Sequence, residues 1–255
     1  MAVPVDDTVV ALADQQDELS NLLAGLPDAS WAAPTRCTGW DVADVVLHLA
    51  QTNEIAIGSV TGRYHEVLTE LGRGIDPASS IDDGAARMVN HQRGAGPDAL
   101  RERWSTGATR LVDELRVMNL STRVPWVAGH LSARTLATTR LAETWIHTGD
   151  VADALGLTLE PGDRLRLIAR LAWRTLPYAF TSAGLTLAGP VAFRLLSPDG
   201  APWDFEPDQP AVTTISGPAT ELCAIAARRL DPSATSVSGD GPDVDAVLAL
   251  VRTYA

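Results

Sequence analysis

Glu143 and His147 are separated by one helical turn in the sequence, so a carboxylate and an imidazole can face the same way. Residues at i and i+4 share one face of an α-helix, with Cβ atoms about 5–6 Å apart, and both can reach one cation. His48, in an apolar-rich stretch, is the best candidate for a third ligand from another element. Two histidines and one carboxylate with open positions suit catalytic zinc, iron, cobalt or nickel. The alternative is a chance E-x-x-x-H pair that faces water.

The helix expected to position Glu143 and His147 begins at Ser132, a good N-cap, and ends at Gly156, a good C′ residue. Side chains spaced alternately by four and three residues form one column on it: Leu136, Arg140, Glu143, His147, Asp150 and Ala154. This column is either a solvated face with an ion-pair ladder or the lining of a polar cavity inside a bundle. Asp150 is interpreted as an ordinary polar helix residue rather than as a partner of His147.

The helix expected to carry His48 begins near Thr38, which is the predicted capping residue, and runs to about Gly62. His48 lies on the flank of the apolar stripe of this helix. That position suits a histidine at the edge of a cleft and a half-exposed surface histidine equally well. Cys37, directly before the helix, is a candidate nucleophile, but a small half-buried residue at the helix entrance is the favoured interpretation.

The pattern of apolar residues changes near residue 157 and predicts two domains, 1–157 and 158–255. The first contains four long helical segments, over about 6–26, 38–62, 97–117 and 132–156, and a short helical piece at 85–92. The second is predicted to be a small α+β domain, in which runs at 191–196, 203–205 and 212–215 form an antiparallel meander. Helices are expected from Pro161 to Leu176, from Pro218 at N1 to Arg229, and from Pro242 to Tyr254, with a last strand at 235–238. The predicted fold class is therefore mixed, a helical bundle followed by α+β structure.

Composition excludes several classes of function. The net charge of −12 argues against a nucleic-acid or anionic-membrane surface, which needs a basic patch. All 20 basic residues are arginine, so Schiff-base chemistry, a pyridoxal-phosphate anchor and a P-loop lysine are excluded. The sequence shows neither a signal peptide nor an apolar stretch long enough to span a membrane. Two distant cysteines without a C-x-x-C pair favour a cytoplasmic, reduced protein.

Two motifs carry a resemblance to a known family. They are 36–50 (RCTGWDVADVVLHLA) and 140–156 (RLAETWIHTGDVADALG). Together they resemble the DinB-like metalloproteins, specifically the mycothiol-dependent maleylpyruvate isomerase family. The stretches 216–229 and 237–240 are similar to the small α+β domain that this family appends to its four-helix bundle. The resemblance implies that His48, Glu143 and His147 are ligands of a divalent metal. It implies zinc, with nickel, cobalt or iron as alternatives.

The resemblance also implies a low-molecular-weight thiol, mycothiol, as co-substrate. Coordination to a dication deprotonates a thiol, which can then add to an alkene and allow cis–trans isomerisation, or displace a leaving group in S-transfer. Arg228 or Arg229 matches the region where the family places a substrate-binding arginine. Arg140 is either a partner that fixes the ligating carboxylate, and so a cofactor-binding residue, or part of a surface ion pair.

Three functions remain open at this point. The favoured one is a mycothiol-dependent isomerase or S-transferase that acts on a small electrophilic metabolite. The second is a metal-dependent hydrolase that activates water. The third is a non-catalytic protein that binds a metal or a small ligand on the same fold. Fold and metal ligands transfer within a family more readily than substrates do, so the sequence does not name the substrate.

Overall fold

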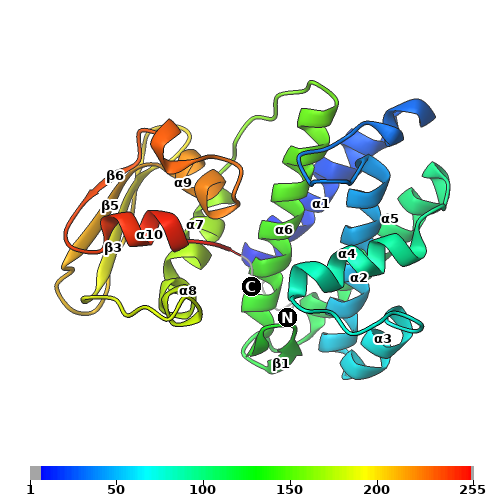
Figure 1. Ribbon diagram of the computed structural model, residues 1–255, viewed down its shortest axis with the longest axis horizontal. Coiled ribbons are helices and arrows are strands. Elements are labelled where there is room, and N and C mark those ends of the chain that lie inside the picture. Colours follow the sequence, from blue (N-terminus) through cyan, green and yellow to red (C-terminus); the bar gives the residue numbers. More distant parts are fainter. Residues whose placement is uncertain (1–6, 254–255) are drawn as a thin grey trace, which may run out of the picture. The chain divides into compact units, whose positions relative to one another are not determined.

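Four long helices build the N-terminal unit, which ends at Leu159; the computed structural model describes residues 7–253. The helices are α1 (Asp7–Ala24), α2 (Val42–Val60), α5 (Pro97–Val117) and α6 (Ala133–Ala154). Both α1 and α2 pack against α5 and α6, so the four helices form a closed ring around one core (Figure 1). Leu12, Leu49, Trp104 and Leu136 are completely buried in this unit. The predicted four-helix bundle is confirmed.

Shorter elements connect the four helices: η1 (Asp28–Ala32), α3 (Tyr64–Leu71), α4 (Ile81–Gln92), β1 (Arg123–Trp126) and β2 (Gly129–Ser132). The sequence interpretation did not include α3, although its residues 64, 67, 68 and 71 follow the spacing of an apolar helix face. It also omitted the antiparallel hairpin of β1 and β2, in which Trp126 pairs with Gly129. Both elements are short, and short elements carry little periodic signal.

The start of α2 differs from the prediction, because Asp41 and not Thr38 caps the helix. The Asp41 side chain accepts a hydrogen bond from the backbone N–H of Asp44, and the Asp44 carboxylate accepts one from the backbone N–H of Asp41. Arg93 then holds the Asp44 carboxylate with two hydrogen bonds of 2.7 and 2.8 Å. A capping box formed by two aspartates therefore fixes the turn from which His48 follows.

The second unit begins at Glu160 and is described here by itself. Its helices are α7 (Leu165–Arg174), α8 (Leu176–Ser182), α9 (Ala219–Ala226), η2 (Pro232–Ala234) and α10 (Val244–Leu250). Its strands are β3 (Val191–Leu196), β4 (Pro202–Phe205), β5 (Thr213–Pro218) and β6 (Ser238–Asp240), in the order β4-β3-β5-β6. The sheet lies beside α7, α9 and α10 (Figure 1). An α+β unit after a helical bundle confirms the predicted fold class.

The predicted antiparallel meander is wrong, since β5 pairs with β3 in parallel and does not pair with β4. The antiparallel hairpin of β3 and β4 returns the chain to the level at which β3 starts, so β5 runs in the direction of β3. Val191, Ala192, Phe193 and Leu195 of β3 are all buried, which is typical of a strand with neighbours on both sides. Placing β5 beside β3 therefore makes the most apolar strand central.

Several predicted boundaries in this unit also move. Pro218 is the N-cap of α9 rather than its first residue, and α9 ends at Ala226. The helix predicted from Pro161 to Leu176 is shorter, since α7 spans Leu165–Arg174; Leu176 instead begins α8, which has Pro177 in its first turn. The last strand lies at Ser238–Asp240, later than expected. The predicted C-terminal helix extended to Tyr254, which lies outside the described residues; α10 ends at Leu250.

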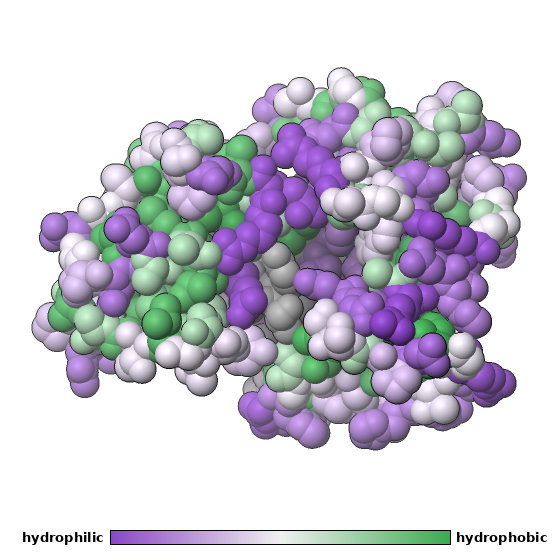
Figure 2. Space-filling model, viewed as in Figure 1, coloured by the Kyte–Doolittle hydropathy of each residue, from purple (hydrophilic) through white to green (hydrophobic). Residues whose placement is uncertain are grey.

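On the face drawn in Figure 2, hydrophilic residues dominate the helical unit, and the unit with the four-stranded sheet displays more hydrophobic residues. The large exposed apolar residues include Val10, Val117, Leu157 and Leu185, which come from separate elements and loops. Among residues 7–253, no helix is long and apolar enough to cross a bilayer.

Candidate metal centre

The three predicted ligands come together inside the helical unit, where α2 packs against α6. His48 Nε2 lies 3.6 Å from Glu143 Oε2, and His147 Nε2 lies 3.7 Å from the same oxygen. The rings of the two histidines are 5.1 Å apart and nearly perpendicular, at 75°. Trp40 lies beside the His48 ring at a centroid distance of 5.1 Å. One oxygen and two nitrogens thus face a common point.

This arrangement fits a divalent cation. Tetrahedral coordination with bonds of about 2.0–2.2 Å places neighbouring ligand atoms about 3.3–3.6 Å apart. The two separations between the histidine nitrogens and the Glu143 oxygen are close to that range, and all three ligand atoms lie within 4.8 Å of one another. The side chains are largely shielded, with relative exposures of 9% for His48, 10% for His147 and 17% for Glu143. The remaining exposure at Glu143 leaves a side from which a small molecule can approach.

Helix geometry explains why the ligands face the same way. Ser132 caps α6 by accepting a hydrogen bond from the Thr135 backbone N–H, and Gly156 ends the helix with φ +67°. Both predicted ends of this helix are confirmed, so Glu143 and His147 belong to consecutive turns. The polar column on α6 is buried, with Arg140 and Asp150 at 0% and 1% exposure. The solvated-face alternative is therefore wrong.

Burial and close charges alter the protonation of the three ligands. Burial opposes the ionisation of Glu143, but a hydrogen bond with His48 and the charges of His147 and Arg140 lower its pKa to about 2. Burial also disfavours a charged His147, yet hydrogen bonds with Asp150 and Cys37 and the charge of Glu143 raise its pKa to about 9. Burial lowers the pKa of His48 despite the Glu143 hydrogen bond. In the metal-free protein, an ionised Glu143 thus faces a charged His147 and a neutral His48 at pH 7.

Asp150 is not the ordinary polar residue that the sequence suggested. Its Oδ2 lies 2.9 Å from His147 Nδ1, so the carboxylate fixes the ring with Nε2 toward Glu143. Cys37 donates a hydrogen bond to the same oxygen at 3.3 Å and lies 3.8 Å from His147 Nδ1. Cys37 is half-buried, as predicted, but its contacts reach the candidate centre. The i, i+3 spacing of His147 and Asp150 was the available signal for this partner.

Arg140 is completely buried, which excludes the predicted alternative of a surface ion pair. Its Nε donates a hydrogen bond to Asn53 Oδ1 at 3.3 Å. Neither Nη atom of Arg140 nor Nδ2 of Asn53 has an acceptor within the described chain. Burial lowers the pKa of Arg140 to about 10, against the attraction of Glu143, so the guanidinium is charged at neutral pH. No pattern in the sequence indicated Asn53 as its partner.

Arg228 and Arg229, the predicted substrate-binding pair, belong to the second unit and follow the end of α9. Arg228 is exposed and has a left-handed backbone conformation, with φ 59°. Arg229 is half-buried and donates a hydrogen bond from Nη1 to the Ala227 carbonyl at 3.0 Å. A positive φ at a non-glycine residue costs about 1 kcal/mol or more and is enriched at functional sites.

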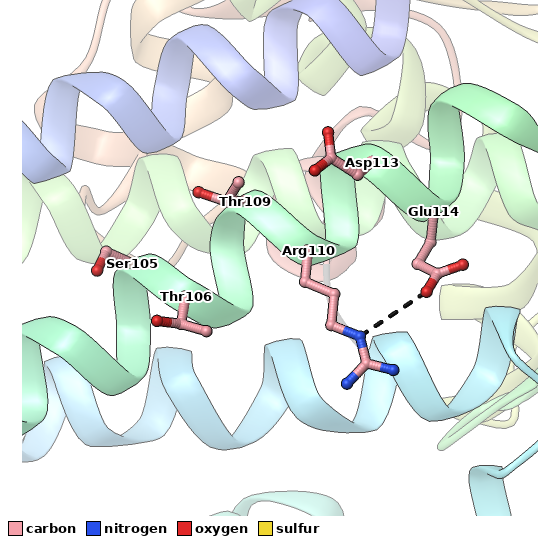
Figure 3. A pocket seen from close by; sticks show the side chains of 6 residues that line it. All are labelled: Ser105, Thr106, Thr109, Arg110, Asp113 and Glu114. Carbon is pink, nitrogen blue, oxygen red and sulfur yellow. Dashed lines mark ion pairs between the residues drawn. The ribbon is translucent and has the colours of Figure 1, made fainter.

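Other polar clusters are less suited to chemistry. Figure 3 shows a shallow hollow along α5 whose lining comes from that one helix: Ser105, Thr106, Thr109, Arg110, Asp113 and Glu114. Its Arg110–Glu114 ion pair, at 3.7 Å, is an i, i+4 contact on a solvated face. His65, His91 and His130 are exposed.

The fold and the ligand geometry define a class: a four-helix bundle with a candidate metal centre between two helices and an appended α+β unit. The sequence matches the mycothiol maleylpyruvate isomerase N-terminal domain family over residues 12–152, more than half of the chain. The chain therefore belongs to this family, and the predicted resemblance is confirmed.

Relatives extend the match over the whole chain. Two uncharacterized proteins from strains of Mycobacterium tuberculosis are each 34% identical over 250 residues, which is 97% of this chain and 95% of the relative. Crystal structures of a mycothiol-dependent maleylpyruvate isomerase and of one of its mutants match with a TM-score of 0.61 and 21% identity. Each match covers 95% of this chain and 96% of the solved one. At this identity the structural likeness concerns the fold.

Proposed function

We propose that this protein is a mycothiol-dependent metalloenzyme that catalyses either cis–trans isomerisation of a small electrophilic metabolite or S-transfer to it. The observation that carries the proposal is the convergence of His48 Nε2, Glu143 Oε2 and His147 Nε2 within 4.8 Å of one another. Membership of the mycothiol maleylpyruvate isomerase family supports the choice of a thiol co-substrate.

In this proposal His48, Glu143 and His147 hold a divalent metal, with zinc as the first candidate and nickel, cobalt or iron as alternatives. When bound, the metal supplies a Lewis-acidic position at which a thiol ionises at neutral pH. Glu143 contributes a negative charge that offsets part of the charge of the cation. Asp150 orients His147 by accepting a hydrogen bond from Nδ1, which leaves Nε2 free to act as a ligand.

The proposal also assigns roles to three arginines. Arg140 supplies a fixed positive charge next to Glu143 that stabilises the anionic form of the thiol co-substrate, and this is its cofactor-binding role. Its buried Nη atoms, which have no acceptor in the described chain, support that assignment. Arg228 and Arg229 bind an acidic group of the substrate, and the left-handed backbone of Arg228 supports a functional role at this turn.

The first experiment is metal analysis of the purified protein and of Glu143→Gln and His48→Ala variants by elemental mass spectrometry. We expect about one transition-metal ion per wild-type chain and loss of that ion in both variants, with helical content unchanged by circular dichroism. His91→Ala is the matched control, because His91 is exposed on α4, and it should retain the metal. A wild type that takes up neither zinc, nickel nor cobalt would remove the basis of the proposal.

Thiol dependence is the second test. The metal-loaded protein is incubated with small activated alkenes and alkyl halides, with mycothiol present or absent. Turnover that requires both mycothiol and Glu143 supports the isomerase or S-transferase assignment. Thiol-independent hydrolysis would instead favour a hydrolase, and metal binding without turnover of any substrate would favour a binding protein.

A further inference from the structure

A second group of ligand atoms lies on the other side of the His147 ring. It consists of His147 Nδ1, Asp150 Oδ2 and Cys37 Sγ. The Asp150 oxygen lies 2.9 Å from the His147 nitrogen and 3.3 Å from the Cys37 sulfur, and the nitrogen and the sulfur are 3.8 Å apart. Neither Cys37 nor Asp150 is among the three ligands of the proposed enzyme. The imidazole of His147 thus has one nitrogen in each of two ligand groups.

The separations in this second group are those of a coordination site. Zinc bonds of about 2.3 Å to sulfur and about 2.0–2.2 Å to nitrogen and oxygen give tetrahedral ligand separations of about 3.3–3.6 Å. The observed distances between the three ligand atoms bracket that range. A thiolate combined with an imidazole and a carboxylate favours thiophilic divalent ions over magnesium or calcium, which prefer oxygen ligands.

The loop that carries Cys37 is held in place before any ion binds. Thr35 Oγ1 donates a hydrogen bond to the Trp40 carbonyl at 2.9 Å and accepts one from the Cys37 backbone N–H at 3.2 Å. Arg36 pairs with Asp153 of α6 at 2.5 Å, which ties the loop to the helix of His147. Cys37 is only half-buried, so the loop lies at the edge of the unit rather than in its core.

We propose that Cys37, His147 Nδ1 and Asp150 form a second cation site, specific for one thiophilic divalent ion such as cadmium or zinc. On binding, bonds form from the ion to Sγ, Nδ1 and Oδ2, and the thiol proton and the Nδ1 proton leave to solvent. A neutral imidazole has only one unprotonated nitrogen, so His147 serves one site at a time. The outer site, defined by Cys37 and Asp150, therefore competes with the inner site, defined by His48 and Glu143.

The test is a titration of the metal-free, full-length protein with cadmium, followed by the ultraviolet charge-transfer band of a cadmium–thiolate bond. We expect the band in the wild type and its loss in Cys37→Ser. Cys223→Ser is the matched control, because Cys223 is the other cysteine and is fully buried in the second unit, and this variant should retain the band. Asp150→Asn should weaken cadmium binding by about tenfold or more.

A Glu143→Gln variant separates the two sites. It should keep the band, and one equivalent of zinc should raise the cadmium concentration needed for half of the band by a smaller factor than in the wild type, because zinc then competes at the outer site only. In the wild type, zinc should raise the cadmium concentration needed for half of the band. Three results would overturn the outer site: the wild type shows no cadmium–thiolate band, the band persists in Cys37→Ser, or the band disappears in Glu143→Gln. Failure of the inner site would appear differently, as metal content unaffected by Glu143→Gln.

Discussion

The interior of the helical unit holds a chain of ionisable groups, each of which alters the protonation of the next. Asp150 and Glu143 favour a charged His147 from opposite sides of its ring, while burial opposes the charge. Arg140 adds a positive charge that favours the carboxylate form of Glu143. Such clustered shifts in pKa are a property of functional sites more often than of structural ion pairs.

Metal uptake should depend on pH because a cation must displace the proton of His147. The pKa of His147 in the metal-free protein is about 9, so its imidazole is charged below that pH and deprotonation opposes binding. Burial lowers the pKa of His48, so its protonation opposes metal binding less than that of His147. Apparent zinc affinity should rise roughly tenfold per pH unit between pH 6.5 and 8.5. Competition with a chromophoric chelator measures it, and a flat profile would contradict the expectation.

Helical spacing and the motif resemblance predicted that His48, Glu143 and His147 lie together, and their ligand atoms are within 4.8 Å of one another. The sequence could not reveal the contact between Cys37 and Asp150. These residues are 113 positions apart, and their contact depends on how the loop before α2 lies against α6. Asn53, the partner of Arg140, was hidden for the same reason, since it depends on the register between α2 and α6.

At the start of α2 the structure departs from the predicted helix cap. The capping box of α2 uses Asp41 and Asp44, although the pattern before the helix suggested Thr38. We expect Asp41→Ala to lower the free energy of unfolding by about 1 kcal/mol, because the N-terminal N–H groups of α2 lose their acceptor. Chemical denaturation measures the change. Thr38→Ala, at an exposed position, should leave the stability unchanged, and the reverse ranking would refute the capping assignment.

The C-terminal end of α9 contains a conformation that glycine would adopt more easily. Arg228 has φ 59°, and the following Arg229 N–H donates to the Ala224 carbonyl at 2.8 Å, which closes the helix. Arg228→Gly should therefore raise the free energy of unfolding by about 1 kcal/mol. Arg229→Gly is the matched control and should not stabilise the protein. If Arg228 also binds substrate, its glycine variant should be more stable and less active.

The sheet illustrates what local patterns cannot decide. Strands β3, β4 and β5 could be located from their apolar residues and the turn at 197–200, but strand order depends on which strand gains most from two neighbours. The run of buried residues in β3 is the feature that favours a central position. The turn signals alone favoured a meander. They indicate where the chain reverses direction, but they do not show that it passes from β4 to the far side of β3 before β5 begins.

All three proposed ligands of the inner site belong to the unit that ends at Leu159, and this unit has its own core. A fragment of residues 1–159 should therefore bind about one zinc ion per chain, and Glu143→Gln should abolish this binding in the fragment as in the full chain. Elemental analysis together with circular dichroism tests the expectation. A folded fragment that binds no metal would show that the centre needs residues of the second unit.

The origin of the ligands on two different helices has a consequence for chain connectivity. A cation held by His48 of α2 and Glu143 of α6 would act as a reversible cross-link closing a loop of 143 − 48 = 95 positions. An ion that binds only the folded state stabilises that state in proportion to the logarithm of its free concentration. The melting temperature of this bundle would then report the free metal concentration around it, so the lifetime of the protein would depend on metal supply.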